Sequence, residues 1–447
     1  MDKFAKIITN IGVLILVLLI AAGCPSQTPI ETPIDEPDSP NQTPIELPMD
    51  NPDVSASANY HIGVVTPPKY YDGEYRSARA LIAQYGSVEN GGIIRHIILP
   101  NNYHDEQETI ISQIAELADD PLMKAVIVNQ GVRGTAAGFQ KIREAGRDDI
   151  ILLTNKPQDN IELISEVATI IVDEDYAMRG YYDIVIAKEM GATKFVHMSF
   201  PRHMGTYAYN RRRAIYEEAC KDLGIEFVFE MIPDVMGDLG ASGTQYWLKD
   251  MMPHLVDKYG KNTVYFATSA IVLEPLIQRV VELEAMFVNQ GDMSPAFGYP
   301  SALGLSLGEQ IEMDDWLTMT QEIEKIVVEK GQSKRMGTWP YSICYCSTIG
   351  LAHLAMDMIE GRDTGDLQRD IKAAYEALTP GCAWVARMFG PDDGIYYKDD
   401  RYYKIDKELN NYFLLTMDTY IFGQGYSGVL SEPFPEKYLR VLVEEWL

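Results

Sequence analysis

The tripeptide Asn-Gln-Gly occurs twice in this chain, at 129–131 and at 289–291, and each copy follows a short apolar run. Side-chain amides offer both donors and acceptors, and Arg133, just after the first copy, adds a fixed fork of donors. Groups of this kind suit a polar ligand that carries hydroxyl, amide or carboxylate groups. The competing interpretation is turn chemistry, because polar residues after a strand commonly form turns or helix caps.

Further polar residues follow other apolar runs in the same way. If each run is a strand of a parallel sheet, these residues lie together at the edge where ligands bind. The predicted ligand contacts are Thr66, Asn101, Asn129, Gln130, Arg133, Asn155 and Asp173, followed by Ser199, Arg202, Thr268, Asn289, Gln290 and Asp292. The basic run Arg211–Arg213 is expected mainly on a solvated face beside acidic neighbours.

The elements that would position these residues form a regular rhythm of short apolar runs and longer amphipathic stretches. Such alternation predicts βα units and parallel sheets. The runs are 61–66, 93–99, 124–130, 149–155 and 168–174, and then 194–200, 225–232, 262–268 and 285–290. The rhythm restarts after about residue 177, which predicts two lobes whose strand ends face one cleft.

The fold class expected is therefore α/β, with two doubly wound parallel-sheet lobes and a C-terminal helical layer that includes a β-hairpin at 394–406. Hinge crossings are expected near 176–180 and 291–300. The predicted domains are a leader at 1–23, a tether at 24–58, lobes at 59–176 and 177–305, and a helical extension at 306–447 that packs on the lobes.

The N-terminus has the features of an export signal. Lys3 and Lys6 precede an apolar stretch at 11–22, which is shorter than the roughly 20 residues that a membrane span needs. The small residues Ala21, Ala22 and Gly23 before Cys24 resemble a bacterial lipobox. The resemblance implies a lipid on Cys24 and removal of residues 1–23; the alternative is an ordinary cleaved signal peptide.

The segment after Cys24 has the composition of a tether. It carries prolines at 25, 29, 33, 37, 40, 44, 48 and 52, several acidic residues and few bulky apolar ones. Such a chain has little to bury and stays extended where it is polyproline II. We expect it to hold a folded body outside the cytoplasm, lipid-anchored at the bacterial cell membrane.

Composition restricts the partners. The chain has 447 residues, with 38 Lys plus Arg against 65 Asp plus Glu, for a net charge of −27. This excess of negative charge opposes binding to nucleic acid and to anionic lipid, so the membrane contact expected is through the lipid. After lipidation four cysteines remain, at 220, 344, 346 and 382. They are expected mainly as small buried side chains, with up to two disulfides possible.

Catalytic motifs are weak in this sequence. The segment "GQGYSG" at 423–428 fits G-x-G-x-x-G but is followed by two prolines rather than a helix, so it is interpreted as a loop. We find no Walker loop, no His-Glu-x-x-His pair and no nucleophile elbow. The sequence therefore predicts no catalytic residue, no metal site and no cofactor.

The order of segments carries a family resemblance. "GVVTPP" at the start, "AVIVNQG" and "IILLTN" in the middle, and "RGYYDIVIAKEMGATKFVHM" at the crossover resemble the type I periplasmic binding proteins. Within that superfamily the chain is most similar to uncharacterised bacterial lipoproteins. The resemblance implies a solute-binding protein that closes on a small polar molecule for a membrane transporter or a sensor. The alternatives are a hydrolase-like surface enzyme that uses the same cleft and, less favoured, a structural surface protein.

Overall fold

The computed structural model describes residues 59–69, 72–290, 294–391, 393, 395–398, 401–404 and 409–441. Cys24, the leader before it and the tether up to residue 58 lie outside this part of the chain, as does Asp292. All described residues belong to one compact unit, Pro44–Leu447. Among them, no helix is both long and apolar enough to cross a membrane.

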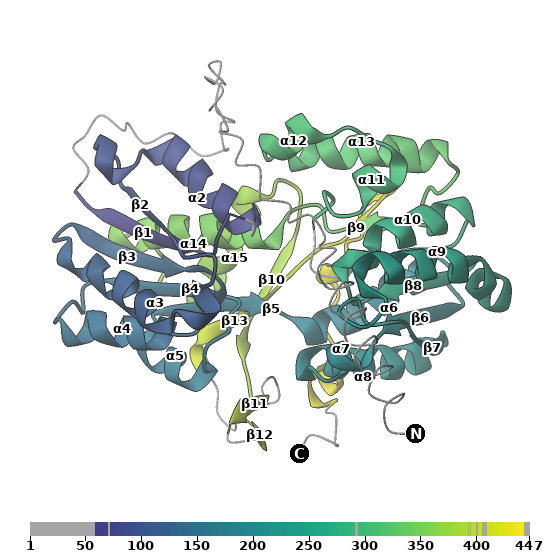
Figure 1. Ribbon diagram of the computed structural model, residues 1–447, viewed down its shortest axis with the longest axis horizontal. Coiled ribbons are helices and arrows are strands. Elements are labelled where there is room, and N and C mark those ends of the chain that lie inside the picture. Colours follow the sequence, from purple (N-terminus) through teal and green to yellow (C-terminus); the bar gives the residue numbers. More distant parts are fainter. Residues whose placement is uncertain are drawn as a thin grey trace, which may run out of the picture. The chain divides into compact units, whose positions relative to one another are not determined.

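A seven-stranded sheet, in the order β10-β13-β5-β4-β3-β1-β2, is the centre of the first lobe (Figure 1). Neighbouring strands are parallel except at the edge, where β10 is antiparallel to β13. Its strands are β1 His61–Thr66, β2 Ile94–Ile98, β3 Met123–Val128, β4 Ile151–Asn155, β5 Ile170–Glu174, β10 Trp384–Phe389 and β13 Leu409–Met417.

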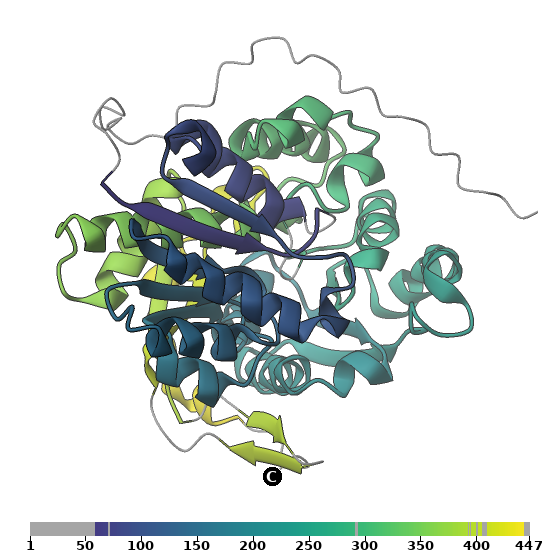
Figure 2. The ribbon, with the colours of Figure 1, turned by 60° about the vertical axis from the view of Figure 1, so that its left-hand side comes forward.

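Continuous apolar runs form these strands because the sheet is buried on both faces. In β3, Ala125 and Ile127 contribute to one core cluster, and Val126 and Val128 contribute to the other. Helices α3 Gln107–Ala115, α4 Thr135–Glu144 and α5 Ile161–Val167 cover one face. Helices α2 Asp72–Tyr85, α14 Ile343–Ile359 and α15 Leu367–Leu378 cover the other (Figure 2).

The second lobe is built on a parallel sheet in the order β7-β6-β8, beside a small sheet in the order β15-β14-β9. Its strands are β6 Lys194–Ser199, β7 Glu226–Met231, β8 Thr263–Ala267, β9 Gly337–Thr338, β14 Tyr420–Ile421 and β15 Gly425–Tyr426. The segment around Met286 and Phe287 connects the two sheets, since it bridges to Val264 on one side and to Met336 on the other.

Helices surround this second sheet as well. Buried residues of α6 and α8 pack on one face, and those of α9 and α10 pack on the other. The helices are α6 Tyr176–Glu189, α7 Pro201–Met204, α8 Tyr207–Leu223, α9 Gly240–Tyr259, α10 Leu273–Glu282, α11 Tyr299–Leu303, α12 Gly308–Glu312 and α13 Trp316–Glu329. The expected fold of two α/β lobes is thus confirmed.

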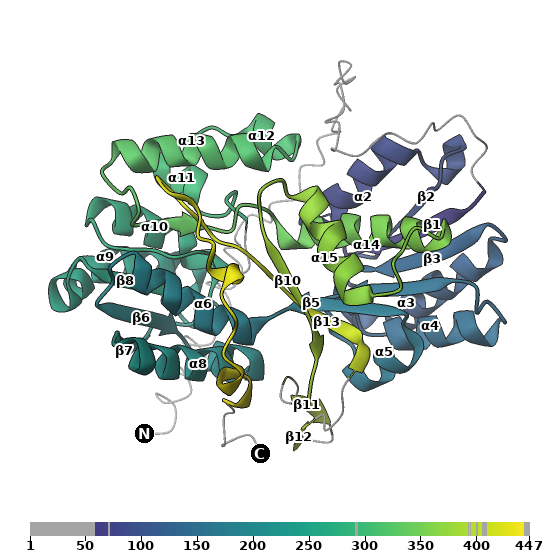
Figure 3. The same cartoon turned by 180° about the vertical axis from the view of Figure 1, so that it is seen from behind.

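The segment after residue 306 does more than add a helical layer. It supplies α14 and α15 as expected, and the expected hairpin forms as β11 Ile395–Lys398 and β12 Arg401–Lys404. It also supplies β10 and β13 to the seven-stranded sheet of the first lobe, and β9, β14 and β15, which form the small sheet of the second lobe (Figure 3). The sequence did not indicate this, because β13 pairs with β5, a strand more than 200 residues earlier in the chain.

Within the described residues, the chain passes between the lobes three times, after β5, after β9 and after β13. The first passage matches the crossing expected near 176–180, because α6 begins at Tyr176 directly after β5. The second expectation, near 291–300, is wrong. Tyr299 of α11 stays in the second lobe, where its hydroxyl donates to the Gly337 carbonyl at 2.7 Å, and the chain crosses only after β9.

Candidate functional site

Three of the predicted contacts at the ends of the first-sheet strands are fully or almost fully buried and bonded to protein groups. Asn129 Nδ2 donates to the Val65 carbonyl at 3.1 Å, while its Oδ1 accepts from Asn155 Nδ2 and from Thr348 Oγ1, both at 2.7 Å. Thr66 Oγ1 shares a 2.8 Å hydrogen bond with His96 Nε2. These side chains tie β1, β3, β4 and α14 together at the strand ends.

Gln130 forms the turn between β3 and α4. Its φ is +59°, and its peptide N–H donates to Asn155 Oδ1 at 2.8 Å. Its side chain donates to Glu74 Oε1 at 2.7 Å and accepts from Gln158 Nε2 at 2.9 Å. The first Asn-Gln-Gly copy thus has a structural role in this turn.

Asn101 and Arg133 are placed differently. Both side chains are exposed, Asn101 after β2 and Arg133 before α4, so the structure does not gather them with the buried strand-end residues. Their side chains remain accessible from solvent at the same edge of the sheet.

The end of β5 carries a cluster of acidic and basic side chains. Asp173 Oδ2 accepts from the Tyr412 hydroxyl at 2.8 Å, and burial raises the pKa of Asp173 to about 6. The next residue, Glu174, is buried and receives two cations: Lys156 Nζ at 2.6 Å and Arg179 Nη1 at 3.0 Å. Sequence analysis identified Asp173 but missed Glu174, Lys156 and Arg179 as a cluster.

The predicted contacts of the second lobe divide into two groups. Ser199 and Thr268 meet at the ends of β6 and β8, where their hydroxyls are 2.7 Å apart and His203 Nδ1 lies 3.0 Å from Thr268 Oγ1. Arg202 is exposed and makes two bonds, of 3.0 and 2.8 Å, to the carboxylate of Asp234. Arg202 is therefore engaged in a surface ion pair.

Asn289 and Gln290 are both buried, directly after the segment around Met286 and Phe287 that connects the two sheets of the second lobe. Asn289 Nδ2 donates to Asp183 Oδ1 of α6 at 2.6 Å. Gln290 Oε1 accepts from the Thr338 hydroxyl at 2.9 Å, whereas its Nε2 has no hydrogen-bond partner among the described residues. The amide nitrogen of Gln290 is thus a buried donor without an acceptor.

The arginine run 211–213 does not lie on a solvated face, so that expectation is wrong. Arg211 and Arg212 are 5% and 2% exposed. Arg211 donates to the Leu439 carbonyl at 2.7 Å and pairs with Asp393. Arg212 lies among aromatic rings, including Tyr176 at 5.3 Å and Phe266 at 5.1 Å, which favour a buried guanidinium through cation–π attraction.

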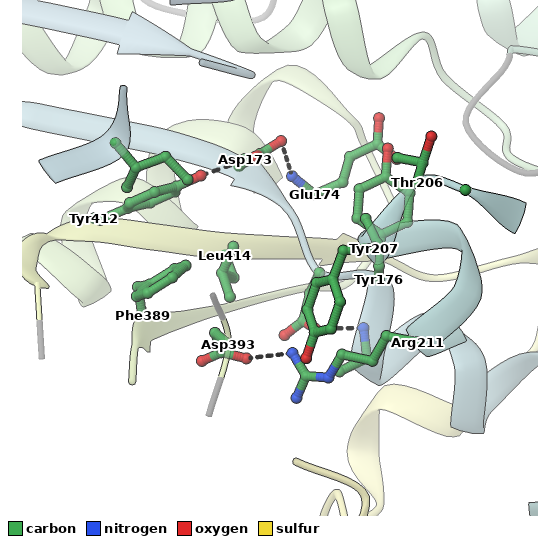
Figure 4. A pocket seen from close by; sticks show the side chains of 15 residues that line it. Asp173, Glu174, Tyr176, Thr206, Tyr207, Arg211, Phe389, Asp393, Tyr412 and Leu414 are labelled. Carbon is green, nitrogen blue, oxygen red and sulfur yellow. Dashed lines mark hydrogen bonds and ion pairs between the residues drawn. The ribbon is translucent and has the colours of Figure 1, made fainter. Parts of the chain in front are cut away.

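A pocket of about 470 Å³ lies between the end of β5 and the start of α8 (Figure 4). Asp173, Tyr412, Phe389 and Leu414 of the first lobe form one wall. Thr206, Tyr207 and Arg211 of the second lobe form another, with Asp393 beside Arg211. Of the predicted contacts that lie in the described part of the chain, Asp173 is the one that lines this pocket. The sequence did not indicate the other lining residues, because β10, β13 and α8 come together only in the folded chain.

The polar side chains that line the pocket are carboxylates, hydroxyls and the guanidinium of Arg211. Each is suited to hydrogen bonding with a polar ligand. Among the described residues, no group of three or more His, Cys, Asp or Glu side chains is placed to hold a metal ion.

Comparison with known sequences identifies a family. Residues 60–337 match the model of a family described as "Protein of unknown function (DUF3798)", and a second family model matches residues 348–441. An uncharacterized protein of Treponema pallidum (strain Nichols) is 42% identical over 185 residues, which are 41% of this chain and 83% of that protein. A second one is 32% identical over 216 residues, which are 48% of this chain and 96% of that protein.

Comparison with solved structures supports the fold. A crystal structure of a "Putative transcriptional regulator" from Clostridium difficile 630 aligns with a TM-score of 0.70 and 22% identity, covering 81% of this chain and 99% of that one. Several sugar and amino-acid transporter proteins align with TM-scores of 0.35 to 0.44, which are too low to transfer a ligand class. The expected likeness to type I periplasmic binding proteins is confirmed as a likeness of fold.

Proposed function

This chain belongs to the DUF3798 family, and we propose that it is a binding protein that closes its two lobes on a small polar solute. One observation carries the proposal: the pocket of about 470 Å³ has walls from both lobes. Small-molecule sites commonly measure about 300–1,000 Å³ and are mostly apolar with a few placed polar groups. Here Phe389 and Leu414 are apolar, and Asp173, Tyr412 and Arg211 supply the polar groups.

The three passages between the lobes support a closing motion. Hinges are typically a few residues at the ends of elements, and each passage is a short segment of this kind. Of the residues predicted from sequence, we propose Asp173 as a direct contact in the pocket. Asn101, Arg133, Ser199, Thr268 and Gln290 remain proposed contacts at the strand ends, whereas Thr66, Asn129 and Asn155 are proposed to hold that edge in place.

We also propose that the protein works outside the cytoplasm and is held to the membrane by a lipid on Cys24. The lipobox-like sequence before Cys24 and the proline-rich segment 24–58 support this. A membrane transporter or a sensor is then the proposed partner. The domain limits at 59–176 and 177–305 are retained as a proposal, with the segment 306–447 shared between both lobes.

The test is direct binding to the full chain, purified gently from producing cells. Native mass spectrometry detects a co-purifying small molecule, and a panel of sugars, amino acids and nucleosides is then screened for a rise in melting temperature. Ala208→Phe places a bulky side chain in the pocket wall, and we expect it to abolish binding.

Ala214→Phe is the matched control, because Ala214 lies on the same helix but lines a different cavity. We expect it to leave binding intact. Binding that survives Ala208→Phe would place the solute elsewhere, and the absence of any shift across the panel would count against a binding protein.

A hydrolase-like function is the second candidate, and Asp173 is the observation that favours it. A carboxyl with a raised pKa in a pocket is a frequent feature of catalytic sites. If this candidate is correct, a solute of the panel is converted by the native chain and left unchanged by Asp173→Asn. Binding without conversion would contradict it.

A further inference from the structure

Arg179 is buried at the first passage between the lobes with much of its donor capacity unused. It is 2% exposed, and its Nη1 donates to Glu174 Oε2 at 3.0 Å. Its Nε and Nη2 touch no solvent and have no hydrogen-bond partner among the described residues. Unpaired donors on a buried cation destabilise a protein. The unpaired donors of Arg179 therefore indicate an acceptor that comes from outside the chain.

The two unused donors form one edge of the guanidinium group. Nε and Nη2 present parallel N–H bonds, the geometry that matches the two oxygens of a carboxylate. The Trp339 ring, at the second passage, holds the group in place, since its centroid is 4.1 Å from the Arg179 Cζ. The edge is therefore rigid and oriented before any ligand binds.

The positive charge of Arg179 lies at the unused edge itself. Its Nη1 pairs with Glu174 Oε2, while Lys156 pairs with Oε1 of the same carboxylate. An anionic ligand at the Nε/Nη2 edge would satisfy donors that would otherwise stay buried without an acceptor.

A second unused donor lies at the same junction. Gln290 is 2% exposed, and its Nε2 is without an acceptor among the described residues. Its Oε1 is fixed by Thr338, the neighbour of Trp339. Both groups without a partner are thus donors, and both belong to residues in contact with Thr338–Trp339. A ligand that satisfies them must supply acceptors.

We propose that the solute carries a carboxylate, which the Nε/Nη2 edge of Arg179 binds as a bidentate pair with Gln290 Nε2 as an additional donor. This rests on the proposed binding function and names the ligand class. Arg179 and Gln290 do not line the pocket of about 470 Å³, but Glu174, which pairs with Arg179, does, so the carboxylate is proposed to extend from the pocket to the first passage. Because the edge is closed to water here, the carboxylate enters when the lobes separate at the three passages and is enclosed when they close.

The test compares matched compounds on the full chain: amino acids against their carboxamides, and hydroxy acids against the corresponding diols. We expect the compounds with a carboxylate to bind and the analogues without one not to bind. Arg179→Met is expected to weaken carboxylate binding by about 10- to 100-fold, the usual effect of losing hydrogen bonds to a charged group. Lys156→Met removes the other cation of Glu174 but no free donor edge, and it is expected to retain most of the affinity.

A second variant guards against misfolding of Arg179→Met. Gln290→Glu keeps the size of the side chain and the acceptor for Thr338 but replaces the free donor by a negative charge, so carboxylate binding should fall. The fluorescence of Trp339 is expected to change on binding, and the change should disappear in Trp339→Phe.

The outcomes separate this inference from the proposed function. A solute that binds but lacks a carboxylate, preferred binding of inorganic phosphate, or unchanged affinity in both Arg179→Met and Gln290→Glu would overturn the carboxylate proposal alone. Failure of every compound to bind would instead contradict the binding function itself.

Discussion

At the residue scale, Asp173 connects the pocket to pH. Its carboxyl group lies at the end of β5 against Tyr412, and burial raises its pKa to about 6, whereas an Asp in an unfolded chain has a pKa of about 4. The folded state therefore binds this proton more tightly than the unfolded state does. The sign follows from linkage: between pH 4 and 6 this group's contribution to stability falls as pH rises.

Asp173→Asn should remove that dependence. As pH rises from 4.5 to 7.5, the free energy of unfolding of the variant is expected to increase by about 2 kcal/mol relative to that of the native chain. The reason is that the variant carries no buried negative charge at neutral pH. Urea denaturation at several pH values measures the difference. Asp234→Asn is the control. Because Arg202 lowers the pKa of Asp234, the contribution of this carboxylate to stability is lost only at more acidic pH. If the two free energies of unfolding differ by the same amount at every pH, the raised pKa of Asp173 is contradicted.

At the scale of elements, the turn from β3 to α4 shows why Gly follows Asn129 and Gln130. Gly131 has a φ of +37°, and a Cβ at this position would lie 2.6 Å from the Pro157 Cα. The turn brings the Gln130 peptide to Asn155 and thereby joins the ends of β3 and β4. Backbone packing explains the glycine of this tripeptide.

Gly131→Ala is expected to destabilise the chain by about 2–4 kcal/mol, because a positive φ and a backbone clash act together. Gly146→Ala is the matched comparison: its φ is +76°, but nothing lies within 4 Å of the added Cβ. It should cost about 1 kcal/mol. Chemical denaturation of the two variants measures both values, and equal losses would show that the close approach to Pro157 has no energetic effect.

At the scale of the molecule, the two lobes are joined by side chains as well as by the three passages. Arg76 of α2 in the first lobe forms an ion pair with Asp314, in the turn between α12 and α13 of the second lobe. Nearby, the rings of Trp316 and Tyr345 are 5.8 Å apart. These contacts favour the arrangement of the lobes described here, so they should influence ligand affinity if binding requires the lobes to separate.

Asp314→Asn should shift the ligand-free chain toward an open arrangement. We expect a larger radius of gyration in small-angle scattering and a few-fold weaker solute binding. Because the pair is largely buried, we also expect a loss of stability of about 1–3 kcal/mol. Asp234→Asn breaks an ion pair within the second lobe and should leave the radius unchanged. An unaltered radius in Asp314→Asn would mean that the pair does not hold the lobes together.

Much of the element pattern could be predicted from local sequence. Runs such as 61–66 and 149–155 became β1 and β4 because a mostly apolar run suits a strand buried on both faces. The hairpin at β11 and β12 was equally visible. The site was less predictable: Asp173 was found, but Asn129 and Arg202 proved to be bonded to protein neighbours.

The sequence by itself determined the two α/β lobes, since hydrophobic periodicity is a local property of each segment. Only the tertiary structure decided that β13 pairs with β5, and that Arg179 meets Glu174 and Trp339. Those contacts join the first passage to a residue 160 positions later and to strands near the C-terminus. Their physical cause is the burial of charge and apolar surface between segments that are distant in sequence, which no local pattern records.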